Sequence, residues 1–302
     1  MTKSTIRSNL SSFNPDIAAT KAQGLDYILG ETNSYSCHGA PGVSNTAGAA
    51  LWALDYTFYA SQIGVTRVHF HDGIGYKYNF VRRSPLLSIV YRLNRLPIQI
   101  QPVTLTRSIL DGSPLSQPLA PHVQPAYYAA IIAAEAIGNT GSARAVELAI
   151  DNPRVAGYAF YEGRKLVRAV LINSQAYLAN NATGYRGTIH VNIQLDGHPG
   201  IAPFLMTIKR LAIGYFLFRM FKRNLTLILA LCSYADDTSG LTWGGQNYET
   251  SDALVSGVKT TDIGLISAGV DLHDTEVVLL NFVDIYSPTS TRHRRRGQRQ
   301  AH

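Results

Sequence analysis

The chain has few cysteines and no stretch typical of an export signal. It contains two cysteines in 302 residues, Cys37 and Cys232. Two cysteines exclude a disulfide framework, and neither has the spacing of a metal site. The first fourteen residues are rich in Ser, Thr and Asn and lack the apolar core of a secretory signal. We therefore expect free thiols, no metal site and no signal peptide in this chain.

Evenly spread positive charge is also lacking, although the net charge is +7. Residues 81–100, 215–234 and 283–302 carry +4, +3 and +4, so the rest of the chain is at −4. Such clustering belongs to short segments and not to a basic domain surface. We therefore expect no nucleic-acid partner. A binder acting through the arginines of residues 292–299 is the alternative, and it requires a steeply salt-dependent affinity.

A transmembrane segment is not expected either. Residues 211–232 are mostly apolar, but Arg219, Lys222 and Arg223 lie at their centre. Inserting each of these charges into a membrane costs about 2.5 to 3.5 kcal/mol of free energy. Each apolar residue contributes only a few tenths of a kcal/mol in favour of insertion, so the run does not offset that cost. The sequence therefore predicts no membrane partner, and it indicates no particular oligomeric state.

Residues 25–42 contain Glu31, the main candidate for a catalytic carboxylate. The apolar and aromatic run at 25–29 predicts a strand that ends at Gly30 and places Glu31 in a polar loop. Barrel enzymes present catalytic groups at the C-terminal ends of their strands. The residues alone support a second interpretation equally well, in which Glu31 caps the structure that follows.

The next segments predict a β/α repeat. Ala47 to Ile63 has apolar residues at helical spacing, follows Asn45 or Thr46 as a cap, and stops at Gly64. Residues 65–73 alternate and end in glycine, as a second strand would. A helix between two strands favours parallel pairing. Residues 126–137 predict a further helix.

Beyond Gly141 the pattern changes to short alternating runs at residues 145–150, 155–161, 166–173, 185–195, 204–212 and 275–282. Turn residues such as Glu162-Gly163 separate them. This pattern is typical of an antiparallel β-sandwich.

Three motifs resemble one enzyme family. Gly30-Glu31-Thr32-Asn33-Ser34, Gly39-Ala40-Pro41 and Leu51-Trp52-Ala53-Leu54-Asp55 resemble family 79 of the glycoside hydrolases, the β-glucuronidase and heparanase group, most closely its fungal members. The resemblance implies an α/β plus all-β fold: the last two β/α units of a (β/α)8 barrel, followed by an antiparallel β-sandwich. It implies a retaining hydrolase of glucuronide-type carbohydrates that needs no cofactor, with Glu31 as the nucleophile.

The resemblance also implies three parts. Residues 1–141 would be the barrel fragment, 142–282 the β-sandwich domain and 283–302 a basic disordered tail. Residues of about 81–100 and 215–234 interrupt the family pattern, and we interpret them as insertions that arise from translated introns or another gene-model error. Six barrel strands would be missing. Family members are typically secreted, so we expect that the true beginning is missing as well.

Substrate-binding residues follow from the same resemblance. Backbone amides of Gly39 and Ala40 would hold the uronic carboxylate, together with Tyr78 or, in a competing alignment, Tyr76. Another family tyrosine corresponds to Ser36, next to Tyr35.

The family's proton donor is a glutamate that follows an asparagine, and no Asn-Glu pair occurs in the sequence. We interpret Asp72 as a structural hydrogen-bonding residue. The chain is therefore expected to be inactive alone. The alternative from another class is a non-catalytic carbohydrate-binding or interaction module built on the β-sandwich.

Overall fold

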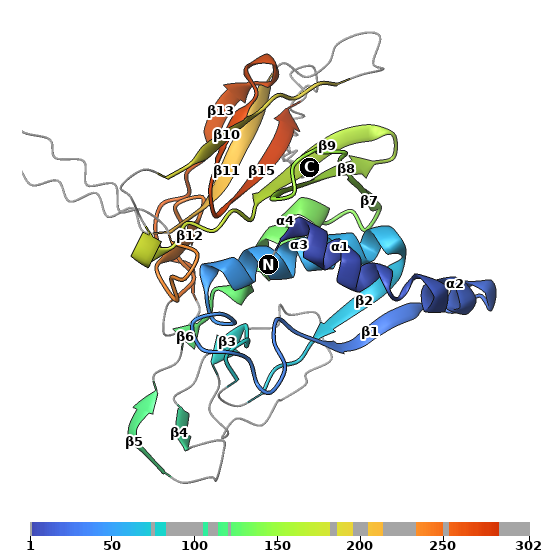
Figure 1. The fold of residues 1–302 in the computed structure, drawn as a ribbon. Helices are drawn as coiled ribbons and strands as arrows, with labels where there is room; N and C mark the ends of the chain where they lie inside the picture. Colours follow the sequence, from blue (N-terminus) through green and yellow to red (C-terminus); the bar gives the residue numbers. More distant parts are fainter. Residues whose placement is uncertain are drawn as a thin grey trace, which may run out of the picture.

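The computed structural model of the chain describes residues 2–73, 76–82, 105–107, 114–119, 122–181, 186–195, 205–213, 234–249 and 254–283. Figure 1 shows them in layers: a parallel strand pair, a layer of helices, a large sheet, and a ribbon of two strands on the sheet's far face. Most of both predicted insertions, and the tail beyond Val283, lie outside the described residues. The predicted domain boundaries stay a prediction.

The predicted strand, helix and strand are present. β1 (Tyr27–Thr32) and β2 (Val65–Phe70) pair in parallel, and α3 (Ala47–Ile63) connects them. α3 begins after Thr46 and ends at Gly64, whose φ of 100° is in the left-handed region that glycine tolerates. β1 extends two residues further than predicted, so that Glu31 lies inside the end of the strand.

Two helices precede this unit. α1 (Lys3–Ser11) lies in the stretch rich in Ser, Thr and Asn, and α2 (Asn14–Ala22) follows it. α1 was not predicted because its apolar face amounts to Ile6 and Leu10, four residues apart, and both are buried in the main core.

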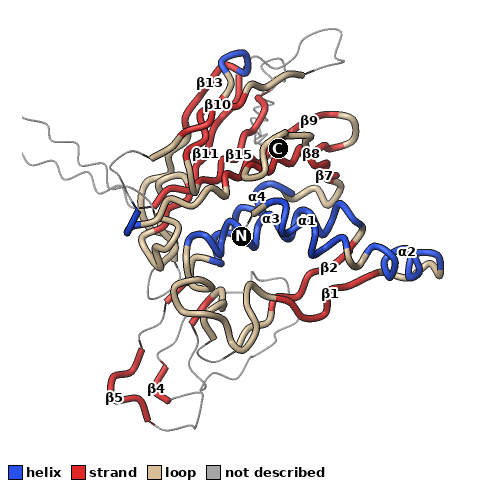
Figure 2. The backbone as a smooth tube through the Cα atoms, viewed as in Figure 1, coloured by secondary structure: helices blue, strands red, loops and turns tan. Residues whose placement is uncertain are grey.

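Seven antiparallel strands form the large sheet, in the order β12-β11-β15-β9-β8-β7, with β13 also paired to β11. The strands described in the second half of the chain are β7 (Ala143–Glu147), β8 (Val155–Glu162), β9 (Lys165–Asn173), β10 (Thr188–Val191), β11 (Leu205–Ile213), β12 (Leu241–Trp243), β13 (Asp262–Leu265), β14 (Val270–His273) and β15 (Glu276–Val283). Short turns of 3-10 helix lie at Ala179–Asn181 and Ile266–Ala268. A large antiparallel sheet is thus confirmed (Figure 2).

Alternation along the strands divides the core in two. On β15, Val277 and Leu279 face the helices, whereas Val278 and Leu280 face away. This is the two-residue period of a strand buried on both faces. The second face is covered by the ribbon of β10 and β14, with Leu272 fully buried. Among the described strands, this ribbon takes the place of the second layer of the expected sandwich.

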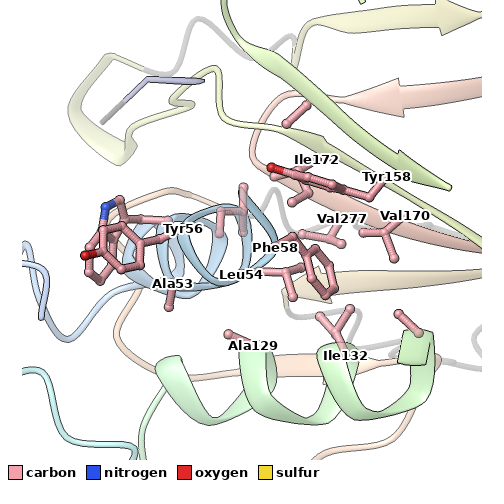
Figure 3. Packing of buried hydrophobic residues seen from close by; sticks show 14 of the residues in the cluster. Ala53, Leu54, Tyr56, Phe58, Ala129, Ile132, Tyr158, Val170, Ile172 and Val277 are labelled. Atoms are coloured by element: carbon pink, nitrogen blue, oxygen red, sulfur yellow. The ribbon is translucent and has the colours of Figure 1, made fainter. Parts of the chain in front are cut away.

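The helices α3 and α4 (Ala126–Ile137) pack on the first face. Figure 3 shows Leu54 and Phe58 of α3 directed toward Tyr158, Val170 and Val277 of the sheet, with Ile132 of α4 beside them. The helical unit and the sheet therefore share one hydrophobic core. Four shorter strands form two further pairs. β3 (Val81–Arg82) pairs with β6 (His122–Val123), and β4 (Leu105–Arg107) pairs with β5 (Pro114–Leu119).

A buried ionic network fastens α1 to this core. The Arg7 guanidinium contacts Asp55 Oδ2 of α3 at 2.6 Å, and its Nη2 contacts Glu147 Oε1 of β7 at 2.6 Å. Arg7 Nη2 donates to the Tyr158 hydroxyl at 2.7 Å, and that hydroxyl donates to Asp55 Oδ1 at 2.5 Å. Burial, and then the Asp55 charge, raises the pKa of Tyr158. Charges from three elements thus meet around Asp55, which is 3% exposed.

No described helix has both the length and the apolar character needed to cross a bilayer.

Candidate active site

Glu31 projects from the end of β1 into solvent, with 72% of its side chain exposed. The pairing register shifts between Leu29 and Thr32. Leu29 is buried in the core, and the Thr32 hydroxyl donates to Tyr56 of α3 at 3.0 Å, so both residues face the helix. A register irregularity of this kind re-aims a side chain, and here it leaves the carboxylate of Glu31 open.

His71, just beyond β2, is the direct partner of this carboxylate. Its Nδ1 lies 2.9 Å from Glu31 Oε1. Two hydrogen bonds join the ends of the strands: the His71 amide donates to the Thr32 carbonyl at 3.0 Å, and Asn33 Nδ2 donates to the His71 carbonyl at 2.9 Å. Because β1 and β2 are parallel, their C-terminal ends meet on one edge and bring these residues together.

Aromatic rings surround the pair. The Tyr76 ring stacks with two imidazoles, its centroid lying 4.2 Å from that of His38 and 5.3 Å from that of His71. Gly73 allows this packing, since a Cβ there would lie 2.2 Å from the Tyr76 ring. The Tyr78 ring meets His71 edge-on at 6.2 Å.

Tyr78 is buried, and burial is the main cause that raises the pKa of its phenol, followed by the neighbouring charges of Tyr76 and Glu31. Gly39, with a φ of +85°, lies against it: a Cβ at Gly39 would be 2.9 Å from Tyr78 Cδ1. The structure therefore brings Glu31, Gly39, Tyr76 and Tyr78 into one neighbourhood.

Ala40 and Tyr35, the other two predicted substrate-binding residues, are placed differently. The Ala40 amide donates to Ser44 Oγ at 3.0 Å, and the Gly39 amide donates to the Ser36 carbonyl at 3.3 Å. A bound carboxylate must compete with these bonds. Tyr35 is 57% exposed and takes no part in the ring contacts that join His38, His71, Tyr76 and Tyr78.

Asp72 has the structural role that the sequence predicted, because its Oδ1 accepts a hydrogen bond from the Phe80 amide at 3.3 Å. Among the described residues, no three His, Cys, Asp or Glu side chains are grouped as metal ligands.

Comparisons with known proteins agree with the resemblance. Residues 157–279 match the glycosyl hydrolase family 79 C-terminal beta domain. A β-glucuronidase of Neurospora crassa is 28% identical over 250 residues, covering 82% of this chain and 40% of that protein. A β-glucuronidase of Aspergillus niger is 33% identical over 150 residues, covering 50% of this chain and 22% of that protein. The chain thus spans less than half the length of these relatives.

A solved structure shares the fold. The crystal structure of a 4-O-α-L-rhamnosyl-β-D-glucuronidase from Fusarium oxysporum 12S superposes with a TM-score of 0.66 at 22% identity. The match covers 92% of this chain and 48% of that one.

The pairing of His71 with Glu31 was missed from the sequence. The signal was present in the polar residues that follow the second strand, at the edge where parallel strand ends meet, but periodicity does not reveal which side chains touch.

Proposed function

The chain corresponds to the C-terminal portion of the family 79 glycoside hydrolases, and from that premise we propose that Glu31 is the nucleophile of a retaining, glucuronidase-type site. The observation that carries the proposal is the exposed Glu31 carboxylate at the C-terminal end of a strand in a parallel β/α/β unit. In barrel enzymes this edge holds the catalytic groups.

We place β1 and β2 as the seventh and eighth strands of a (β/α)8 barrel. The helix between them, their parallel pairing and the exposure of Ile28, at 40%, support this placement. An isolated pair of parallel strands leaves edges and an apolar face without cover, and further strands of a barrel would cover them.

The chemistry needs a second carboxyl group. In a retaining hydrolase the nucleophile attacks the anomeric carbon while a carboxylic acid about 5 to 5.5 Å away protonates the leaving oxygen. The 302 residues contain no Asn-Glu pair, and the carboxylate of Asp72 is bound to a backbone amide. We therefore propose that the isolated polypeptide does not turn over glucuronides, and that a complete enzyme of this kind hydrolyses them with retention and without a cofactor.

Binding of the sugar provides a test that does not require turnover. Glucuronate titrated into the purified chain should shift the amide NMR signals of Gly39 and Ala40, because the uronic carboxylate competes for those amides. Tyr78→Phe should weaken binding about tenfold or more if the phenol donates to the carboxylate, as expected for a lost hydrogen bond to a charged group.

Glucose, which lacks the carboxylate, is the matched ligand, and Tyr161→Phe on β8 is the matched variant. Equal shifts with glucose, or none with glucuronate, would contradict the assignment of Gly39, Ala40 and Tyr78.

A carbohydrate-binding module built on the sheet is the competing proposal. Stacking platforms for sugars need exposed aromatic rings, and the large hydrophobic side chains exposed on the described sheet strands are the aliphatic residues Val146, Ile263 and Leu265. Glycan binding that survives Glu31→Gln and Tyr78→Phe together would favour the module.

A further inference from the structure

We propose that Asn79 is a positioning residue for Tyr78: its side-chain amide ties the backbone after Tyr78 to Gly73 and so holds the phenol ring against Gly39. The inference rests on the proposed function, which assigns Tyr78 to the uronic carboxylate, and it adds the group that sets the place of this tyrosine.

The Asn79 side chain makes two hydrogen bonds to one residue. Its Oδ1 accepts from the Gly73 amide at 3.0 Å, and its Nδ2 donates to the Gly73 carbonyl. Only Oδ1 can accept from an N–H group and only Nδ2 can donate to a carbonyl, so the orientation of the side-chain amide is defined. Gly73 precedes Tyr76 and Asn79 follows Tyr78. The two bonds therefore join the chain on either side of both rings.

Burial makes these bonds hard to replace. Asn79 is 3% exposed, so water has little access to its amide. Leucine has nearly the shape of asparagine but offers neither a donor nor an acceptor. At position 79 it would leave the buried Gly73 amide without its acceptor, which is costly inside a protein. Asn79→Leu is thus the substitution that removes the closure without adding charge near the proposed carboxylate site.

A second bond anchors the residue on the other side of Tyr78. The Lys77 amide donates to the His38 carbonyl at 2.8 Å, and His38 directly precedes Gly39. Both chain neighbours of Tyr78 are therefore fixed by hydrogen bonds, one of them to the loop that contains Gly39.

The place of Tyr78 depends on this anchoring because its contact with Gly39 is close. A Cβ at Gly39 would lie 2.9 Å from Tyr78 Cδ1, and the tyrosine is 6% exposed. A carboxylate held by the phenol and by the amides of Gly39 and Ala40 needs these groups in a fixed relation. Binding groups keep such a relation only when surrounding bonds support them.

A double-mutant cycle with glucuronate tests the positioning role. Asn79→Leu should weaken binding about tenfold, as Tyr78→Phe should, because the released ring no longer presents its hydroxyl. Since Asn79 acts through Tyr78, the double variant should bind no more weakly than Tyr78→Phe alone. Losses that add in the double variant would overturn the role.

Asn247→Leu is the matched control. Asn247 also bridges a loop, with Nδ2 donating to the Leu241 carbonyl at 3.0 Å and Oδ1 accepting from the Glu249 amide at 2.7 Å. It belongs to the sheet domain, so its loss should leave glucuronate binding unchanged. Equal weakening by Asn79→Leu and Asn247→Leu would show a general loss of structure and overturn the specific role of Asn79.

Two NMR measurements need no ligand. The Gly73 amide of the wild-type chain should be protected from hydrogen exchange. The Gly39 signals, shifted by the Tyr78 ring, should move toward the values of an unstructured chain in Asn79→Leu and stay in place in Asn247→Leu.

An unprotected Gly73 amide in the wild-type chain, or Gly39 signals that stay in place in Asn79→Leu, would contradict the inference. The wild-type exchange rate decides the first of these even when the variant does not fold. Failure of the wild-type chain to bind glucuronate would count against the proposed function and leave both NMR results intact, so the two failures are distinguishable.

Discussion

Asp55→Ala is expected to lower the free energy of unfolding by about 3 to 5 kcal/mol, the loss typical when one partner of a buried ion pair is removed. The Asp55 side chain is 4% exposed and accepts from both Arg7 and Tyr158. Without it, the guanidinium of Arg7 keeps Glu147 as its anionic partner, and the Tyr158 hydroxyl loses its closest acceptor. Urea denaturation followed by tryptophan fluorescence measures the change.

The matched control is the double variant Arg7→Met with Asp55→Ala. It removes the cation along with its partner, and replacing a buried pair by apolar residues is often close to neutral. The double variant should therefore be more stable than Asp55→Ala alone. If the double variant loses as much free energy of unfolding as Arg7→Met and Asp55→Ala lose together, the two charges do not stabilise the fold as a pair.

Phe58→Ala is expected to lower the free energy of unfolding by about 3 to 5 kcal/mol, the usual range when a large aromatic side chain is deleted from a core. Phe58 of α3 is 3% exposed, and its ring lies 5.1 Å from that of Tyr158 and 5.2 Å from that of Phe160. Because these partners belong to the sheet, the loss should lower the stability of helices and sheet together. Circular dichroism and tryptophan fluorescence should then follow one transition.

Val146→Ala, at a position that is 48% exposed on β7, is the control and should change stability by less than about 0.5 kcal/mol. Two separate transitions, with only one of them moved by Phe58→Ala, would mean that the β/α unit and the sheet fold independently.

Much of the fold was visible in the sequence because the period of the apolar residues was clear. α3 and α4 were predicted to their last residues, and the runs that became β8, β9, β11 and β15 were placed within one residue. The short strands β12, β13 and β14 were missed because three or four residues carry too little alternation. The core shared between helices and sheet was not predicted either, since it depends on contacts between residues more than a hundred positions apart, such as Tyr158 and Asp55.

The sequence predicted part of the arrangement around Glu31. The motifs pointed to Glu31, Gly39, Tyr76 and Tyr78, and the structure brings these four together. The outward aim of Glu31 depends on a register shift between Leu29 and Thr32, which no one-dimensional pattern encodes. The contact with His71 depends on the same register, because it sets which residues stand opposite one another at the strand ends.

The most direct measurement is the hydrolysis of a chromogenic β-glucuronide by the purified 302-residue chain and by its Glu31→Gln variant. On the proposed role of Glu31, and because the sequence contains no Asn-Glu pair to supply the family's proton donor, we expect both proteins to give the rate of the buffer. Turnover by the wild-type chain that Glu31→Gln abolishes would contradict this expectation, since it would require a second catalytic carboxyl group within these residues.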